Sequence, residues 1–172
     1  MEAITRLDLA FSLFCLRHRF RHPVAKISRW VSRTGDGHFY AVLVLMIWRL
    51  DHHYGEDFTT CVLLAFAFEL PIYWLAKNSI KRRRPQEISP FVEPFITPSD
   101  RYSLPSGHTA AAFLMATLIS FFYPNFMLLS FVWAALIGSA RILLGVHFLT
   151  DVLVGALLGV LSAKLALTYT IV

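Results

Sequence analysis

Three short groups of polar residues stand at the ends of apolar segments, and their side chains are of the kinds that bind and attack phosphate. The first group runs from Lys77 to Arg84, the second is the PSGH tetrapeptide that ends at His108, and the third runs from Arg141 to Asp151. Arginine pairs with a phosphate through two coplanar N–H groups, and lysine contributes a compact positive charge. The combination predicts an anion site, most simply one for phosphate.

The second and third groups also contain candidates for catalysis. Ser106 and Gly107 precede an apolar run, where the free N–H groups of a helix N-terminus would attract an anion. His147 lies four residues before Asp151, so on a helix the carboxylate can accept a hydrogen bond from one imidazole nitrogen and leave the other as a nucleophile. His108 is then suited to protonate a leaving oxygen.

Each group has a plainer interpretation when it is taken alone. A basic run beside a membrane helix more often sets topology than binds a ligand. PSGH is an ordinary helix start, and an isolated histidine and aspartate four residues apart are more often structural, or a weak metal half-site. Arg141 is harder to dismiss, because a charge near the end of an apolar run usually has a partner. Only the three groups taken together favour a catalytic site over these plainer interpretations.

The elements that must position these groups are membrane helices. Only 16% of the 172 residues are charged, whereas soluble domains contain about 25%. A spanning helix needs roughly 20 mainly apolar residues. The apolar segments are Phe58–Ala76, Phe126–Leu144 and Val152–Val172, with shorter ones at His38–Leu50 and Thr109–Phe122. We therefore expect one all-α domain over residues 1–172, a polytopic membrane bundle of five to six helices with its helical core in residues 37–172.

Residues 1–36 are expected to form an amphipathic helix that lies in the membrane interface rather than a sixth crossing. Leu7, Phe11 and Phe14 recur at helical spacing, whereas Asp8 and Ser12 fall on the opposite face. We expect an amphipathic helix in the interface, with its basic residues toward the lipid headgroups.

The order of the apolar segments places the three polar groups on one side of the membrane. The first group follows one crossing, the second precedes the next crossing, and the third lies where the following crossing returns. The first two are joined by the loop 77–106, which carries five prolines. A loop of this length in a compact domain is usually functional or disordered, so we expect it to contribute to a site.

Taken together, the motifs resemble those of the type-2 phosphatidic acid phosphatase superfamily. Lys77 stands seven residues before Arg84-Pro85, PSGH covers Pro105 to His108, and Arg141 is followed at the family's spacing by His147 and Asp151. One position departs from the family pattern. Ala140 precedes the arginine of the third motif where the family usually has serine, which puts in doubt only a minor hydrogen bond.

The resemblance implies a role for each matching residue. His147 would attack phosphorus and form a phosphohistidine, Asp151 would orient it, and His108 would protonate the leaving group. The phosphoryl oxygens would be held by Lys77, Arg84, Ser106, Gly107 and Arg141. The family uses no metal and no cofactor, so none is expected here.

The implied protein is an integral membrane phosphatase for a lipid phosphomonoester or diphosphate. Phosphatidic acid, phosphatidylglycerophosphate and undecaprenyl diphosphate are the candidate substrates, and the remaining residues do not choose between them. The expected partners are this lipid and the bilayer, without nucleic acid or an obligate protein partner. A phosphatase for small soluble phosphates and a non-catalytic lipid-binding or transport protein are the alternatives. The net charge of +5 would also suit nucleic acid, but the chain has no long polar region for such a face.

The resemblance also implies a bacterial inner membrane with the site on the extracytoplasmic side. This orientation conflicts with the positive-inside rule, because 13 of the 16 Lys and Arg residues lie in residues 1–36 and 77–101. Three basic residues, Lys81, Arg82 and Arg83, are expected to contact headgroups or solvent. Glu69 lies within an apolar segment, and its role as a structural partner or a site residue stays open.

Overall fold

The computed structural model describes residues 2–17, 19–98 and 100–170, and within these ranges the regular structure is entirely helical. The helices are α1 (Glu2–Leu16), α2 (Arg21–Arg33), α3 (Gly37–Leu50), α4 (Gly55–Ile80), α5 (Pro85–Ile88), α6 (Gly107–Phe122), the 3₁₀ turn η1 (Pro124–Phe126), α7 (Met127–Leu143) and α8 (Leu149–Thr170). The prediction of an all-α membrane bundle is confirmed. The helices α4, α7 and α8 belong to segments long and apolar enough to cross a membrane, whereas α3 and α6 are shorter.

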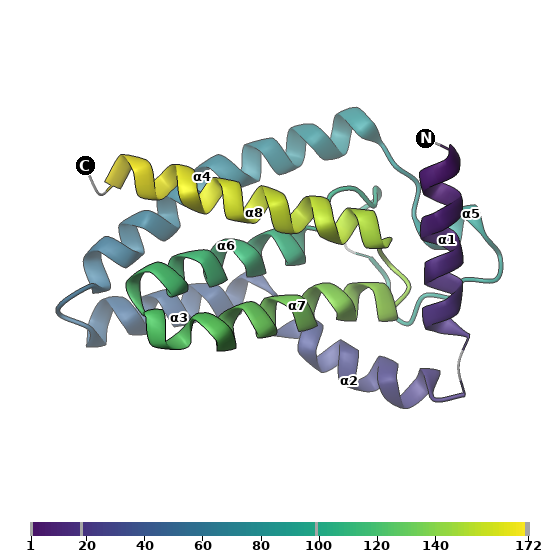
Figure 1. Cartoon of the computed structure of the whole chain (residues 1–172), viewed down its shortest axis with the longest axis horizontal. Helices are drawn as coiled ribbons and strands as arrows, with labels where there is room; N and C mark the ends of the chain where they lie inside the picture. The colour runs from purple at the N-terminus through teal and green to yellow at the C-terminus, as the bar shows by residue number, and fades with distance from the viewer. Residues whose placement is uncertain (1, 18, 99, 171–172) are drawn as a thin grey trace.

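The five apolar helices run alternately up and down along one axis (Figure 1). The turn between α3 and α4 lies at one end of the bundle, and the loops that precede α6 and α8 lie at the other end, which we call the site end. Backbone hydrogen bonds tie these loops together. Phe95 N donates to Leu144 O at 3.0 Å, and Ser103 N donates to Arg82 O at 2.9 Å. The bundle therefore brings the three polar groups to one end, as the order of the segments predicts.

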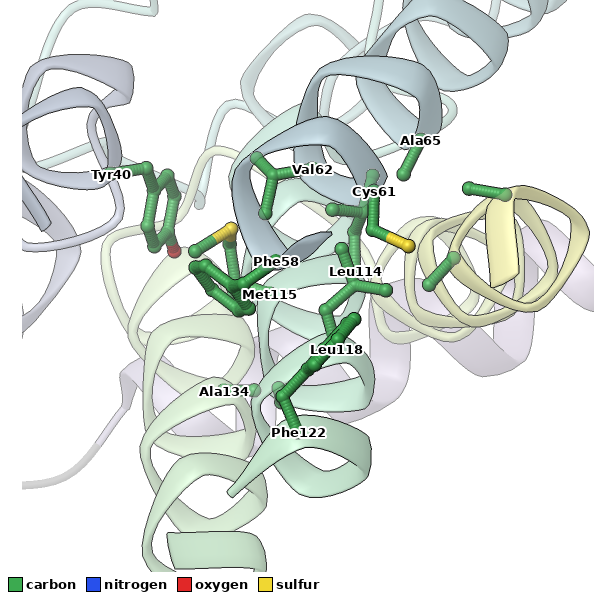
Figure 2. Packing of buried hydrophobic residues seen from close by; sticks show 14 of the residues in the cluster. Tyr40, Phe58, Cys61, Val62, Ala65, Leu114, Met115, Leu118, Phe122 and Ala134 are labelled. Carbon is green, nitrogen blue, oxygen red and sulfur yellow. The ribbon is translucent and has the colours of Figure 1, made fainter. Parts of the chain in front are cut away.

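The core is built around α6, whose apolar residues are covered by α4, α7 and α8. Leu114, Met115 and Leu118 of α6 point toward Phe58 and Cys61 of α4 (Figure 2). The large apolar side chains on the outer surfaces of α4, α7 and α8 are exposed, which is the arrangement expected of helices that face lipid tails. The 16-residue α6 is thus positioned by its neighbours, and its N-terminus lies at the site end.

The close contact between α6 and α8 depends on glycine. A Cβ atom on Gly159 would lie 2.1 Å from the Ala110 carbonyl oxygen, and one on Gly155 would lie 2.5 Å from the Ser106 carbonyl oxygen. Both obstacles are backbone atoms, which cannot move aside as a flexible side chain can. Glycine therefore sets the separation of the two helices that carry His108 and Asp151.

We expect Gly159→Ala to destabilise the protein by about 2 kcal/mol or more, because α6 and α8 must separate to admit the new methyl group. The measurement is the thermal unfolding midpoint of the purified protein in detergent. The matched control is Gly37→Ala, since a Cβ atom at Gly37 meets nothing within 4 Å. Equal midpoints for the two variants would contradict this account of the helix contact.

The N-terminal segment forms two helices, where we expected one. α1 lies crosswise over the site end of the bundle, and α2 packs against α7 (Figure 1). The predicted amphipathic pattern of α1 is present, but Asp8 and Ser12 on its polar face point into the protein. Leu7 and Phe14 are 73% and 81% exposed, whereas Asp8 and Ser12 are only 4% and 1% exposed. Asp8 meets the polar partners Arg82 and Thr150 there. The Ser12 hydroxyl is buried without a hydrogen bond to any residue that the structure describes.

Candidate active site

His147 lies in the short connection between α7 and α8, and its side chain is buried. Its Nδ1 lies 2.7 Å from the backbone carbonyl oxygen of Ser103. Because a carbonyl can only accept, Nδ1 carries the hydrogen and Nε2 keeps its lone pair. Burial lowers the pKa of His147, and the nearby Arg141 and Arg84 guanidiniums lower it further, to about 4, despite the Asp151 carboxylate. The imidazole is therefore neutral at pH 7 and has a free nitrogen.

Asp151 is fully buried in the first turn of α8, where it contacts three groups. One carboxylate oxygen accepts from the backbone N–H of Phe148 at 2.8 Å and lies 3.7 Å from His147 Nδ1. The other oxygen accepts from an Arg82 Nη at 2.6 Å. We expected the carboxylate to hold the imidazole by a direct hydrogen bond, but the Ser103 carbonyl occupies that position. Asp151 instead supplies a negative charge beside His147.

Lys77 and Arg84, at the end of α4 and the start of α5, converge on one carboxylate. Lys77 Nζ donates to one oxygen of Asp100, and an Arg84 Nη donates to the other. Tyr73, one turn before Lys77 on α4, also donates to Asp100, at 2.6 Å. Arg84 makes further hydrogen bonds to the carbonyl oxygens of Tyr102, at 3.1 Å, and of Val146. The two cations are thus fixed side by side at the site end.

Arg141 is buried near the end of α7 and has unused hydrogen-bonding capacity. One Nη donates to the Ser32 hydroxyl at 2.8 Å. Its Nε is buried and makes no hydrogen bond with any of the residues that the structure describes. Arg141 is close enough to Arg84 and Asp100 to interact with them electrostatically. Three of the predicted phosphate-binding cations therefore lie together, and one of them lacks a full set of partners.

The N-terminus of α6 faces the same region. Ser106 is the N-cap residue and is fully buried, but its side chain makes no capping bond, so the first N–H groups of the helix stay available. A Cβ atom on Gly107 would lie 3.0 Å from the ring of Tyr73, so glycine permits this close approach. His108 Nε2 lies 2.9 Å from a carboxylate oxygen of Asp36, the residue before α3.

Several residues of the site were missed or misread in the sequence. Arg82 was expected to contact headgroups or solvent, which is wrong. It is 13% exposed, and it pairs with Asp8 of α1 and with Asp151, both at 2.6 Å. Asp36 and Asp100 stand in a turn and a loop, outside the three motifs, and neither was predicted to pair with a site residue. Glu69 is buried inside α4, and its role stays open.

Comparisons with known proteins identify the family of the chain. The sequence model of the PAP2 superfamily matches residues 57–171. Over 142 residues the chain is 29% identical to a probable lipid phosphate phosphatase beta of Arabidopsis thaliana, covering 66% of each chain. Over 143 residues it is 32% identical to phosphatidylglycerophosphatase B of Bacillus subtilis, covering 76% of this chain and 68% of the relative. The chain thus spans about two thirds of the length of these curated relatives.

Two solved structures share the fold. A PAP2-type phosphatidylglycerolphosphate phosphatase from Bacillus subtilis superposes with a TM-score of 0.78 at 24% identity, covering 98% of this chain and 87% of the other. Aquifex aeolicus LpxE superposes with a TM-score of 0.75 at 26% identity, covering 95% and 96%. The family match covers more than half of the chain and includes all three polar groups that meet at the site end. The chain belongs to the PAP2 superfamily.

Proposed function

We propose that the protein is an integral membrane phosphatase that hydrolyses a lipid phosphomonoester or diphosphate through a phosphohistidine at His147. The observation that carries the proposal is the hydrogen bond from His147 Nδ1 to the Ser103 carbonyl. It fixes the tautomer in which Nε2 is unprotonated, and a neutral imidazole with a free Nε2 is the form that can attack phosphorus.

The reaction needs two proton transfers and no metal ion. Nε2 of His147 attacks phosphorus as the bond from phosphorus to the leaving oxygen breaks, and His108 gives that oxygen a proton. A water molecule then attacks the phosphohistidine while His108 takes its proton, which releases phosphate and restores both histidines. The imidazolium that forms when Nε2 bonds to phosphorus is stabilised by the Asp151 carboxylate, 3.7 Å from Nδ1.

The charge on the phosphoryl group is stabilised by Lys77, Arg84 and Arg141 together with the N–H groups at the start of α6. These donors are held in place before substrate arrives, so they cost little reorganisation in the transition state. The free Nε of Arg141 is a donor that phosphate would satisfy. The site lies at the end of the bundle, which suits a substrate whose tail remains in the bilayer.

We propose an orientation with the site end on the extracytoplasmic side. The excess of basic residues at this end argues against it by the positive-inside rule. Part of that excess is explained by contacts inside the protein, because Lys77, Arg82 and Arg84 are buried or nearly buried in ion pairs. Such residues are positioned by their partners, and they report less on topology than free surface charges do.

We expect purified protein in detergent to release phosphate in the presence of EDTA, because the proposed chemistry uses only groups of the protein and water. The substrate panel is phosphatidylglycerophosphate, phosphatidic acid, undecaprenyl diphosphate and p-nitrophenyl phosphate, and the order of kcat/KM values identifies the class. Release from a lipid that survives EDTA supports the proposal. Release that EDTA abolishes would overturn the metal-free mechanism, and no release from any substrate would favour a lipid-binding or transport protein.

A further inference from the structure

Asp100 binds two of the cations that the proposed function assigns to the phosphate. Its two carboxylate oxygens accept from Lys77, Arg84 and the Tyr73 hydroxyl. These are the types of donor that bind phosphoryl oxygens, and two of them are family phosphate ligands by their motif positions. These cations are therefore bound to an internal anion.

The two cations are more deeply buried than the carboxylate that they bind. The side chains of Lys77 and Arg84 are 7% and 3% exposed, whereas that of Asp100 is 33% exposed. The cations thus form the inner wall of the site, and the carboxylate lies on its open side. Burial alone would raise the pKa of Asp100, but the hydrogen bonds from Lys77 and Tyr73 and the charges of Lys77 and Arg84 lower it to about 2. The resident group is an anion at every physiological pH.

The backbone of Asp100 is held separately from its side chain. Arg84 Nε donates to the Asp100 carbonyl oxygen at 3.2 Å. The carboxylate can therefore leave the cations by rotation of its side chain while the main chain stays bound to Arg84.

We propose that Asp100 is a displaceable anion that holds Lys77, Tyr73 and Arg84 in the empty site, gives way to the phosphoryl group of the substrate, and returns as phosphate leaves. This inference rests on the proposed function, because it takes Lys77 and Arg84 as phosphate ligands. A competing internal anion weakens the binding of every phosphate by the same factor, which is the inverse of the fraction of sites that are open. It raises KM and favours the release of the product.

The test is the binding of inorganic phosphate to the full-length protein, measured by isothermal titration calorimetry in detergent. We expect Asp100→Asn to lower the Kd for phosphate by about tenfold or more, since the cations lose their internal competitor. The KM for the lipid substrate should fall by a similar factor. The matched control is Glu93→Gln, which removes the same charge from an exposed position in the same loop.

Two results would overturn the proposal. If Asp100 only positions Lys77 and Arg84, Asp100→Asn will bind phosphate equally or less tightly and KM will not fall. If tightening occurs equally in Glu93→Gln, it reflects net charge. Should Asp100→Asn fail to fold, Asp100→Ser removes the same carboxylate and is judged by the same criteria. The calorimetric readout does not require turnover, so a failed phosphohistidine mechanism would remain distinguishable from a failed displacement.

Discussion

Replacing His147 with alanine is expected to lower the rate of phosphate release by a factor of about ten thousand or more, as the loss of a nucleophile does in other enzymes. Two nearby candidates are poorly placed to substitute, because Asp151 lies on the Nδ1 side of the ring and His108 is held by Asp36 at 2.9 Å. The fold should survive, because the side chain contributes one hydrogen bond to a loop carbonyl.

The measurement is phosphate release together with trapping of the intermediate. Protein mixed with radiolabelled substrate and quenched in alkali should retain label on His147, and His147→Ala should retain none. The matched control is His52→Ala, which removes an exposed histidine at the other end of the bundle. A folded His147→Ala protein with the full rate would rule out the phosphohistidine. Label that persists in this variant would point to another nucleophile.

The helices and their order could be predicted from the sequence because the membrane imposes a simple rule. Each apolar segment must satisfy its backbone within itself, so length and hydropathy identify the crossings. The prediction of His38–Leu50 and Thr109–Phe122 as shorter helices is confirmed by α3 and α6. The position of the three polar groups at one end followed from counting crossings, which needs no knowledge of packing.

The orientation of α1 could not be predicted in the same way. An amphipathic pattern shows that a helix has two faces, but it does not show which face meets the protein. Here the polar face is buried because Asp8 accepts hydrogen bonds from Arg82 and from Thr150 N–H. These partners are 74 and 142 residues away in the sequence, so no local pattern could have revealed them.

The acidic residues of the site were missed for a related reason. Asp36 lies in a short turn and Asp100 in a long loop, and neither belongs to one of the three motifs. Their contacts with His108 and with Lys77 exist only because α3, α4 and α6 begin or end at the same level of the bundle. Motifs identified the cations and histidines, whereas the anions that position them emerged from the fold.

Arg82→Ala is expected to destabilise the protein by about 3 kcal/mol, because removing one partner of a buried ion pair leaves the other charges uncompensated. Asp8 and Asp151 are 4% and 0% exposed, and without Arg82 each buried carboxylate loses the guanidinium that donates to it. The guanidinium also stacks on the ring of Phe148, 4.4 Å from its centroid. The connection that carries His147 would lose this support, so kcat should fall by about a hundredfold or more.

The matched control is the neighbouring Arg83→Ala, an exposed position where we expect a change below about 0.5 kcal/mol. Thermal unfolding and kcat are measured for both variants in detergent. Adding Asp8→Asn to Arg82→Ala should recover part of the lost stability, because it removes one of the two uncompensated charges. It should recover less of kcat, since Asp151 beside His147 still lacks its cation. If Arg82→Ala matches Arg83→Ala in both measurements, the ion-pair network joining α1 to α8 does not support the site.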